Sequence, residues 1–167
     1  NIVLIGFMGT GKTTVGAALS ERLGWRFVDT DKEIVSREKM TIPELFATRG
    51  EAAFRAIEAE VLASVLEGTK QVVSTGGGAV LRPENRRAML EGGYVVALAA
   101  PYETLIERLR GDANRPLLAG GEERVRRLLE ERRDAYSFAH LTLDTSALSV
   151  RETVETIVER SGAGRRS

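Results

Sequence analysis

The first 14 residues constrain the fold of this chain more than any other stretch. An apolar run leads into Gly6-x-x-x-x-Gly11-Lys12-Thr13, a complete phosphate-binding loop, and a helix-favouring segment follows. Glycines let the backbone turn tightly, so that successive N–H groups converge on one phosphate group. The helix that starts at the loop adds its free N–H groups and the positive end of its dipole. The pattern predicts a strand, a nucleotide-binding loop and a helix, in that order.

The residues of this loop are expected to hold a nucleoside triphosphate and Mg²⁺. Lys12 reaches the terminal phosphates in such loops and supports the reaction there, and the Thr13 hydroxyl ligates the metal. The alternative is a Gly-rich turn that happens to carry a lysine. The predicted nucleotide-binding residues are consecutive: Gly9, Thr10, Gly11, Lys12, Thr13 and Thr14.

Composition limits the class of protein. With 167 residues, 43% of them hydrophobic and 29% charged, the chain suits one compact globular domain. Because 24 basic residues balance 24 acidic ones, the charge gives no argument for nucleic acid or an anionic membrane as a partner. No apolar run approaches the length of a membrane span. The absence of cysteine excludes a disulfide framework and fits a reducing compartment, and the single histidine excludes a multi-histidine metal site.

Apolar runs rich in β-forming residues alternate with helical segments. The expected strands are Ile2–Ile5, Arg26–Asp29, Gln71–Ser74, Tyr94–Ala99 and Leu141–Leu143. The expected helices are Lys12–Leu23, Thr41–Leu66 with a break near Gly50, Pro83–Glu91, Tyr102–Arg110, Glu122–Phe138 and Val150–Arg160. This alternation predicts an α/β protein built from βαβ units, with ligands at the carboxyl ends of the strands. We expect a single domain over residues 1–160 and a flexible tail over 161–167.

Two carboxylates, Asp29 and Asp31, follow the end of the second expected strand. An extended segment would put both on the same side. One can hold Mg²⁺, and the other can accept a hydroxyl proton and orient that oxygen toward the γ-phosphate. The alternative is a helix N-cap, since Thr30 or Asp31 precedes a helical stretch. Phosphate-loop enzymes often carry an acidic metal ligand near the end of the third strand, where this chain has Ser74, so Asp29 is the main candidate for the metal.

A second candidate binding region combines an ion pair with a run of glycines. Arg55 and Glu58 are three residues apart in an expected helix and share a face. The arginine suits a substrate carboxylate gripped by two hydrogen bonds, and the glutamate would fix the guanidinium; the alternative is a solvated ion pair. After the third strand, Gly76-Gly77-Gly78 offers bare backbone to a ligand and has more glycines than a tight turn needs.

The region between the last two long helices has the composition of a mobile lid, over about residues 111–121. Its ends are rich in small, polar and glycine residues. Arg115 stands there in a Gly/Pro context. An arginine on a lid can close over the phosphates, neutralise transition-state charge and exclude water. A charged amphipathic helix explains most of the other charges in this region.

In this order and spacing, the motifs resemble the shikimate kinase family over nearly the whole chain. They are Gly-Phe-Met-Gly-Thr-Gly-Lys-Thr-Thr at 6–14, Asp29-Thr-Asp31, Phe54-Arg55-x-x-Glu58, Gly76-Gly77-Gly78, Arg115-Pro-Leu-Leu118 and Glu131-Arg132-x-x-x-Tyr136. The resemblance implies a three-layer P-loop kinase fold of the nucleoside-monophosphate-kinase type. Its parallel sheet would have five strands in the order 2-3-1-4-5, helices on both faces, substrate-binding helices at about 31–60 and a mobile lid.

The resemblance also implies the reaction. The γ-phosphate of ATP, with Mg²⁺, would pass to the 3-hydroxyl of shikimate in chorismate and aromatic amino-acid biosynthesis, in a cytoplasmic monomer. Asp31 matches the residue that binds the reacting hydroxyl and serves as its base. Arg55 and Arg132 match the arginines that hold the shikimate carboxylate. Gly77 matches a backbone contact to the substrate, with Gly76 and Gly78 beside it.

On the nucleotide side, the resemblance implies three further roles. Arg115 matches the lid arginine on the phosphates, Asp29 the carboxylate that holds the metal through water, and Arg108 the arginine that packs on adenine. One departure concerns the base: residues 144–149 lack an arginine that some family members place against adenine, so backbone contacts are expected there. Another comes after Tyr136, where many members are acidic and this chain has Ser-Phe-Ala-His.

Two other functions compete with this one. The first is another small-molecule kinase of the same fold, with a gluconate-like acceptor. The second is a non-catalytic domain that binds nucleotide or shikimate and regulates a partner. Such a domain would be expected to lose Lys12, Asp31 or Arg115, and all three are present.

Overall fold

Five parallel strands form the centre of the computed structural model, which describes residues 1–111 and 121–164. The order across the sheet is β2-β3-β1-β4-β5, which confirms the expected order. In the middle strand, Val3 lies beside Val73 on one side and Val95 on the other. The strands are β1 (Ile2–Ile5), β2 (Arg26–Asp29), β3 (Gln71–Ser74), β4 (Tyr94–Ala99) and β5 (Leu141–Asp144).

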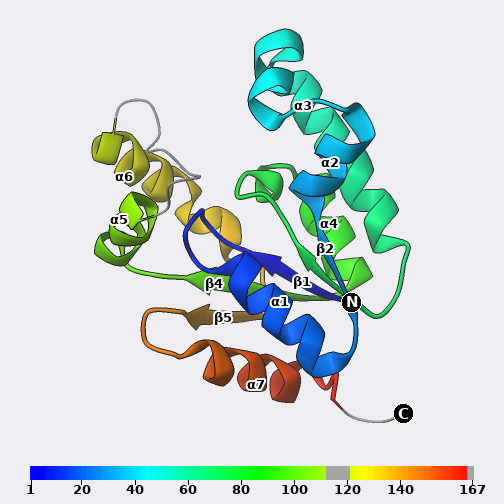
Figure 1. Ribbon diagram of the computed structural model, residues 1–167, viewed down its shortest axis with the longest axis vertical. Coiled ribbons are helices and arrows are strands. Elements are labelled where there is room, and N and C mark those ends of the chain that lie inside the picture. Colours follow the sequence, from blue (N-terminus) through cyan, green and yellow to red (C-terminus); the bar gives the residue numbers. More distant parts are fainter. Residues whose placement is uncertain (112–120, 165–167) are drawn as a thin grey trace.

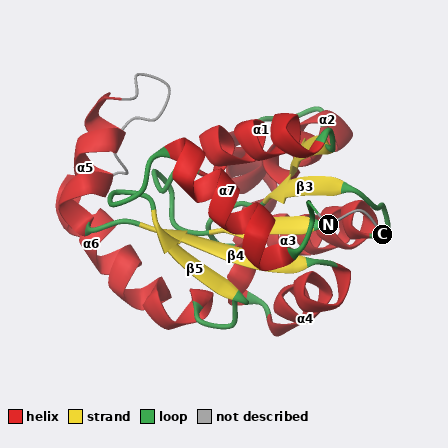
Figure 2. Cartoon of the chain, turned by 90° about the horizontal axis from the view of Figure 1, so that it is seen from below, coloured by secondary structure: helices red, strands yellow, loops and turns green. Residues whose placement is uncertain are grey.

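Helices cover both faces of the sheet, as Figures 1 and 2 show. Two short 3₁₀ turns, Ala79–Leu81 and Arg133–Tyr136, follow β3 and the sixth helix. The helices are α1 (Lys12–Leu23), α2 (Thr30–Glu38), α3 (Ile42–Leu66), α4 (Pro83–Gly92), α5 (Tyr102–Gly111), α6 (Gly121–Arg132) and α7 (Val150–Ser161). No helix of the described residues combines the length and apolar character needed to cross a bilayer.

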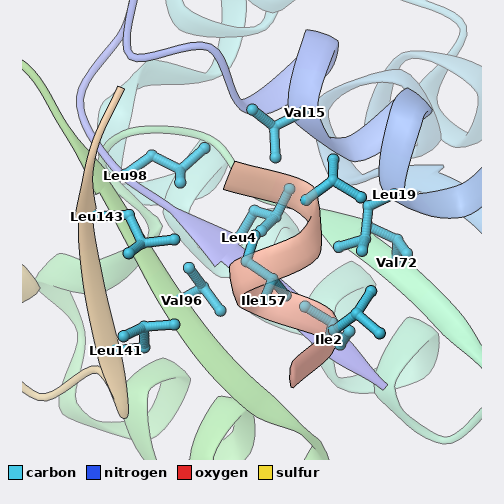
Figure 3. Close-up of a cluster of buried hydrophobic side chains, with 12 residues drawn as sticks. Ile2, Leu4, Val15, Leu19, Val72, Val96, Leu98, Leu141, Leu143 and Ile157 are labelled. Carbon is cyan, nitrogen blue, oxygen red and sulfur yellow. The ribbon is translucent and has the colours of Figure 1, made fainter. Parts of the chain in front are cut away.

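Alternate residues of β1 join two hydrophobic cores, one on each face of the sheet. Ile2 and Leu4 pack with Ile157 of α7 and with apolar residues of α1 (Figure 3). Val3 and Ile5 point to the opposite face, where the core includes residues of α3 and α4. Since all four residues of β1 are buried, the strand must be apolar throughout, as in a parallel strand covered on both faces.

Several elements differ from the sequence-based expectation, and α3 to α7 each differ by at least one residue at one end. α2 was not among the helices expected from periodicity, although the resemblance implied helices at about 31–60, because only Thr30 and Ile34 of its residues are buried. The expected helix Glu122–Phe138 ends at Arg132 and continues as a 3₁₀ turn. β5 extends one residue further, to Asp144. The expected break in α3 is confirmed at Gly50, whose φ of 82° and ψ of 169° are non-helical.

The parallel arrangement brings three loops to one edge of the sheet. The phosphate loop leaves β1, α2 leaves β2, and the glycine run leaves β3, all from the carboxyl ends of neighbouring strands. In Figure 1 the dark-blue loop between β1 and α1 lies between the α2–α3 pair on one side and the α5–α6 pair on the other. Ligands of parallel α/β sheets bind at such an edge.

The core around β1 yields a stability prediction. Leu4 is fully buried, so Leu4→Ala should lower the free energy of unfolding by about 2–5 kcal/mol, through lost apolar burial and a cavity. Leu90→Ala, at a side chain that is 41% exposed, is the matched control and should change it far less. Urea unfolding monitored by circular dichroism measures both. Equal losses would contradict the central place of β1 in the core.

Candidate active site

The phosphate loop folds tightly between β1 and α1. Gly6, Gly9 and Gly11 have φ angles of 147°, 80° and 98°, which other residues rarely adopt. At Gly6 a side chain is also excluded by space, because a Cβ atom would lie 2.4 Å from the carbonyl oxygen of Leu98. Gly11 begins α1 without a side-chain cap, so the first N–H groups of the helix remain open to an anion.

Lys12 extends back across this loop. Its Nζ donates to the carbonyl oxygens of Gly6 at 2.5 Å and Phe7 at 3.1 Å. The buried Thr10 hydroxyl also donates to Phe7, at 2.7 Å, and braces the turn. The ammonium group therefore lies at the loop, where the sequence placed the terminal phosphates. Thr13 and Thr14 lie exposed in the first turn of α1.

A cavity of about 230 Å³ continues from the loop toward the segment after β5. Arg108 forms one wall: its Nη1 donates to the carbonyl oxygen of Gly9 at 2.8 Å and to Thr145 Oγ1 at 3.1 Å. Thr145 in turn donates to the carbonyl oxygen of Thr10 at 2.7 Å. Sequence reasoning placed Arg108 here and expected backbone contacts over residues 144–149, but it named no side chain of that segment. It did not predict five of the lining residues: Val15, Thr145, Leu148, Val150 and Thr153.

Asp29 and Asp31 do not share a side of an extended strand, contrary to the sequence argument. β2 ends at Asp29 and α2 begins at the next residue. Asp29 Oδ1 caps the helix by accepting the N–H groups of Asp31 at 2.9 Å and Lys32 at 3.3 Å. The capping alternative named Thr30 or Asp31, but the cap of α2 is Asp29, through one carboxylate oxygen. Asp31 lies in the first turn and faces the glycine run.

The three glycines of 76–78 are approached closely by the predicted substrate-binding side chains. A Cβ atom on Gly76 would lie 2.9 Å from Asp31 Oδ1 and 3.3 Å from an oxygen of Glu58. The equivalent atom on Gly77 would lie 3.4 Å from Arg132 Nη1, and on Gly78 2.4 Å from Arg55 Nη2.

Side chains from α2, α3 and α6 thus meet over this backbone, which leaves too little room for a Cβ atom at Gly76 and at Gly78. This acceptor pocket, made of Asp31, Arg55, Glu58, Arg132 and residues 76–78, also adjoins the phosphate loop. A Cβ atom on Gly77 would lie 3.6 Å from the carbonyl oxygen of Gly6, to which Lys12 donates.

The ion pair within this pocket is buried, so the solvated alternative was wrong. Arg55 Nη1 lies 2.9 Å from Glu58 Oε1, and their side chains are 15% and 2% exposed. Burial raises the pKa of the Glu58 carboxyl, Arg55 opposes this, and the nearby charge of Asp31 adds to the rise. Among the described residues, Arg55 Nε has no hydrogen-bond partner, although Glu51 lies 3.9 Å away.

Tyr136 contacts the glycine run, although the sequence analysis quoted it only as part of a motif and gave it no role. Its hydroxyl donates to the carbonyl oxygen of Gly77 at 2.8 Å. Burial raises the pKa of this phenol, and the charge of Arg132 opposes the rise. The predicted lid arginine, Arg115, lies outside the described residues together with most of the lid.

A phosphate loop that adjoins a small pocket with two arginines and a carboxylate defines a P-loop phosphotransferase for a small anionic acceptor. The family model described as "Shikimate kinase" matches residues 8–161. The chain belongs to the shikimate kinase family.

Relatives and solved structures agree with this assignment. The shikimate kinase of Geobacter metallireducens is 46% identical over 94% of this chain and 89% of its own length. That of Symbiobacterium thermophilum is 47% identical over 96% and 95%. The structure of shikimate kinase from Acinetobacter baumannii in complex with shikimate has a TM-score of 0.90 at 38% identity, covering 100% of this chain and 95% of that one.

A gluconokinase from Sinorhizobium meliloti shows only a shared fold. Its TM-score is 0.57 at 19% identity, over 98% of this chain and 90% of that one. A likeness at this level carries no argument for a gluconate-like acceptor, and neither of the two competing functions is favoured.

The buried Glu58 predicts a pH dependence of stability. Because its pKa is raised in the folded state, the folded protein holds more protons than the unfolded chain at pH values above the ordinary glutamate pKa of 4.5. The stability that the protonated Glu58 carboxyl contributes therefore falls as pH rises toward neutrality. The free energy of unfolding of wild type minus that of Glu58→Gln should therefore decrease between pH 4.5 and pH 7.

Urea unfolding at a series of pH values measures this difference. Glu60→Gln is the matched control, because Glu60 lies on the same helix in an exposed pair with Arg37. The wild-type minus Glu60→Gln difference should stay nearly flat. An identical slope for both variants would contradict the assigned direction of the Glu58 shift.

Proposed function

We propose that this chain transfers the γ-phosphate of ATP to the 3-hydroxyl of shikimate, giving shikimate 3-phosphate and ADP. The observation that carries the proposal is the convergence of Asp31, Arg55 and Arg132 on the glycine run, directly beside the phosphate loop. Family membership supports the same reaction. The structure from A. baumannii contains shikimate, a small carboxylate of the kind that such a pocket suits.

The two arginines would bind the shikimate carboxylate. Glu58 occupies Nη1 of Arg55, which leaves Nη2 for the substrate; both nitrogens lie close to Gly78. Arg132 approaches the neighbouring Gly77 from the end of α6. Hydrogen bonds between charged groups in a partly buried pocket are strong and directional, so they orient the ring as well as hold it.

Asp31 would bind the reacting hydroxyl and accept its proton. It starts at the edge of the sheet from which the phosphate loop also leaves, so the hydroxyl oxygen would face the γ-phosphate. Phosphoryl transfer needs in-line placement and charge neutralisation more than covalent help from the protein. Lys12 would neutralise charge on the phosphates, and Arg115, on the lid, remains a predicted second source of positive charge.

The residues at the phosphate loop fit Mg²⁺. Hard oxygen donors are available from the Thr13 hydroxyl and from the Asp29 carboxylate, one oxygen of which caps α2. Among the described residues, no group of three acidic or histidine side chains encloses a metal. This suits an ion held mainly by phosphates and water. When bound, Mg²⁺ would neutralise charge on the β- and γ-phosphates.

Several finer points of the proposal remain predictions: the place of the reaction in chorismate and aromatic amino-acid biosynthesis, a cytoplasmic location, a monomeric state and the absence of nucleic-acid or membrane partners. Arg108 and the cavity beside Thr145 would take the adenosine part of ATP. Size-exclusion chromatography with light scattering tests the monomeric state directly.

A coupled ADP-release assay tests the function. ADP release should require shikimate and should not occur with gluconate or a nucleoside monophosphate in its place. Faster release with gluconate would support the kinase alternative. ATP binding without acceptor-dependent ADP release would support a regulatory domain.

The proposed base yields the first prediction of this mechanism. Asp31→Asn should lower kcat by about 10²- to 10⁴-fold, because the amide cannot accept the hydroxyl proton. The Kd for ATP, measured by calorimetry, should stay within about twofold, a change of less than 1 kcal/mol. Asp134→Asn, at an exposed aspartate of the turn after α6, is the control. Turnover near the wild-type value in Asp31→Asn would remove this residue from the mechanism.

The proposed binding of the shikimate carboxylate by Arg55 yields the second prediction of this mechanism. Arg55→Ala should raise the KM for shikimate by about 10- to 100-fold, because a hydrogen bond between charged groups is lost. Arg49→Ala is the control: Arg49 lies on the same helix but is exposed, and it pairs with Glu38 at 2.9 Å. Steady-state kinetics measures both.

Loss of stability must be separated from loss of binding in this experiment, because Arg55→Ala leaves Glu58 buried without its partner. Arg55→Lys keeps a positive charge beside Glu58 but removes the planar fork that grips a carboxylate. It should also raise the KM, with a smaller loss of melting temperature. An unchanged KM in both variants would show that Arg55 only neutralises Glu58.

A further inference from the structure

The glycine run after β3 has its carbonyl groups bound and its N–H groups left over. The carbonyl oxygen of Gly76 accepts from Ala79 and that of Gly78 from Leu81, both at 3.1 Å. Within the part of the chain that the structure describes, the N–H groups of Gly76, Gly77 and Gly78 donate to no protein group. These donors belong to the acceptor pocket, so a ligand is their available partner.

The carbonyl group of Gly77 differs from its neighbours because a side chain binds it. Tyr136 donates to it at 2.8 Å, whereas the carbonyls on either side are held by the local backbone turn. A peptide unit is planar and trans, so fixing this carbonyl also fixes the N–H of Gly78 in the opposite direction. Between two glycines little else opposes a rotation of the peptide, because neither carries a Cβ atom.

The hydroxyl of Tyr136 is suited to this task because its ring is held firmly. The ring packs against two hydrophobic cores, one containing Val3 and Ile5 and the other containing Phe7 and Leu105. A phenol is protonated at neutral pH, and burial raises the pKa of this one further, so its hydroxyl is available as a donor. Four residues earlier in the chain, Arg132 approaches the same glycine, 3.4 Å from where its Cβ atom would lie.

We propose that Tyr136 is a positioning residue for the acceptor: its hydroxyl fixes the Gly77–Gly78 peptide and so keeps the free N–H group of Gly78 directed to the substrate. The contact also fixes the distance between Arg132 and the glycine run, since Arg132 ends α6 and Tyr136 lies in the turn that follows it. Rotation of the peptide would instead present a carbonyl dipole to an anionic substrate. This inference rests on the proposed function and concerns the same pocket.

The test is Tyr136→Phe, which keeps the ring and removes only the hydroxyl. The Kd and KM for shikimate should rise about 5- to 10-fold, as expected for one net hydrogen bond, while the KM for ATP stays unchanged. Tyr102→Phe is the matched control. Its hydroxyl also donates to a backbone carbonyl, that of Glu122 at 3.3 Å, away from the glycine run. It should leave both shikimate constants at the wild-type values.

The outcomes separate this inference from the function on which it rests. Failure of wild type to release ADP with shikimate would overturn the proposed function. If wild type binds shikimate, the ratio of Kd values between the two phenylalanine variants decides the role of Tyr136. Equal Kd values would overturn it. So would a parallel rise of both KM values with a fall in melting temperature, because that pattern indicates a purely structural role.

Discussion

The buried ion pair between Arg55 and Glu58 is the interaction on which the acceptor pocket depends. Removing two charges from water is unfavourable, and here burial outweighs the attraction of Arg55 in setting the pKa of Glu58. Stability alone gives a poor account of such a pair. Its effect is geometric: Glu58 holds Nη1 of the guanidinium, the whole group lies against Gly78, and Nη2 is left for a ligand. The pocket thus carries an oriented positive charge before any substrate arrives.

That orientation has value only because the sheet brings the other parts of the site to the same place. Neighbouring parallel strands end at one edge, and the three strands β2, β3 and β1 deliver Asp31, the glycine run and the phosphate loop there. Glycine at 76 and 78 then lets side chains from α2 and α3 approach the backbone more closely than a Cβ atom would allow. The topology sets which residues meet, and the glycines set how closely.

Much of this could be predicted from sequence where chemistry is local. The phosphate loop, the strands and the break at Gly50 follow from residue patterns a few positions long. The capping alternative named Thr30 or Asp31 and missed the actual cap, Asp29, because the position of the cap depends on where β2 ends. The burial of Arg55, the contact of Tyr136 with Gly77 and the wall formed by Thr145 could not be derived, since each joins residues that are distant in the chain.

The double-sided core around β1 has a consequence for how the two halves of the site withstand partial unfolding. The nucleotide loop grows out of the strand with the most cover, whereas Asp31 and Arg55 stand on α2 and α3, toward the β2 edge of the sheet. Cooperative units at the margin of a domain open more readily than its centre. Partial unfolding should therefore release the acceptor-binding residues on α2 and α3 first, and the phosphate loop last.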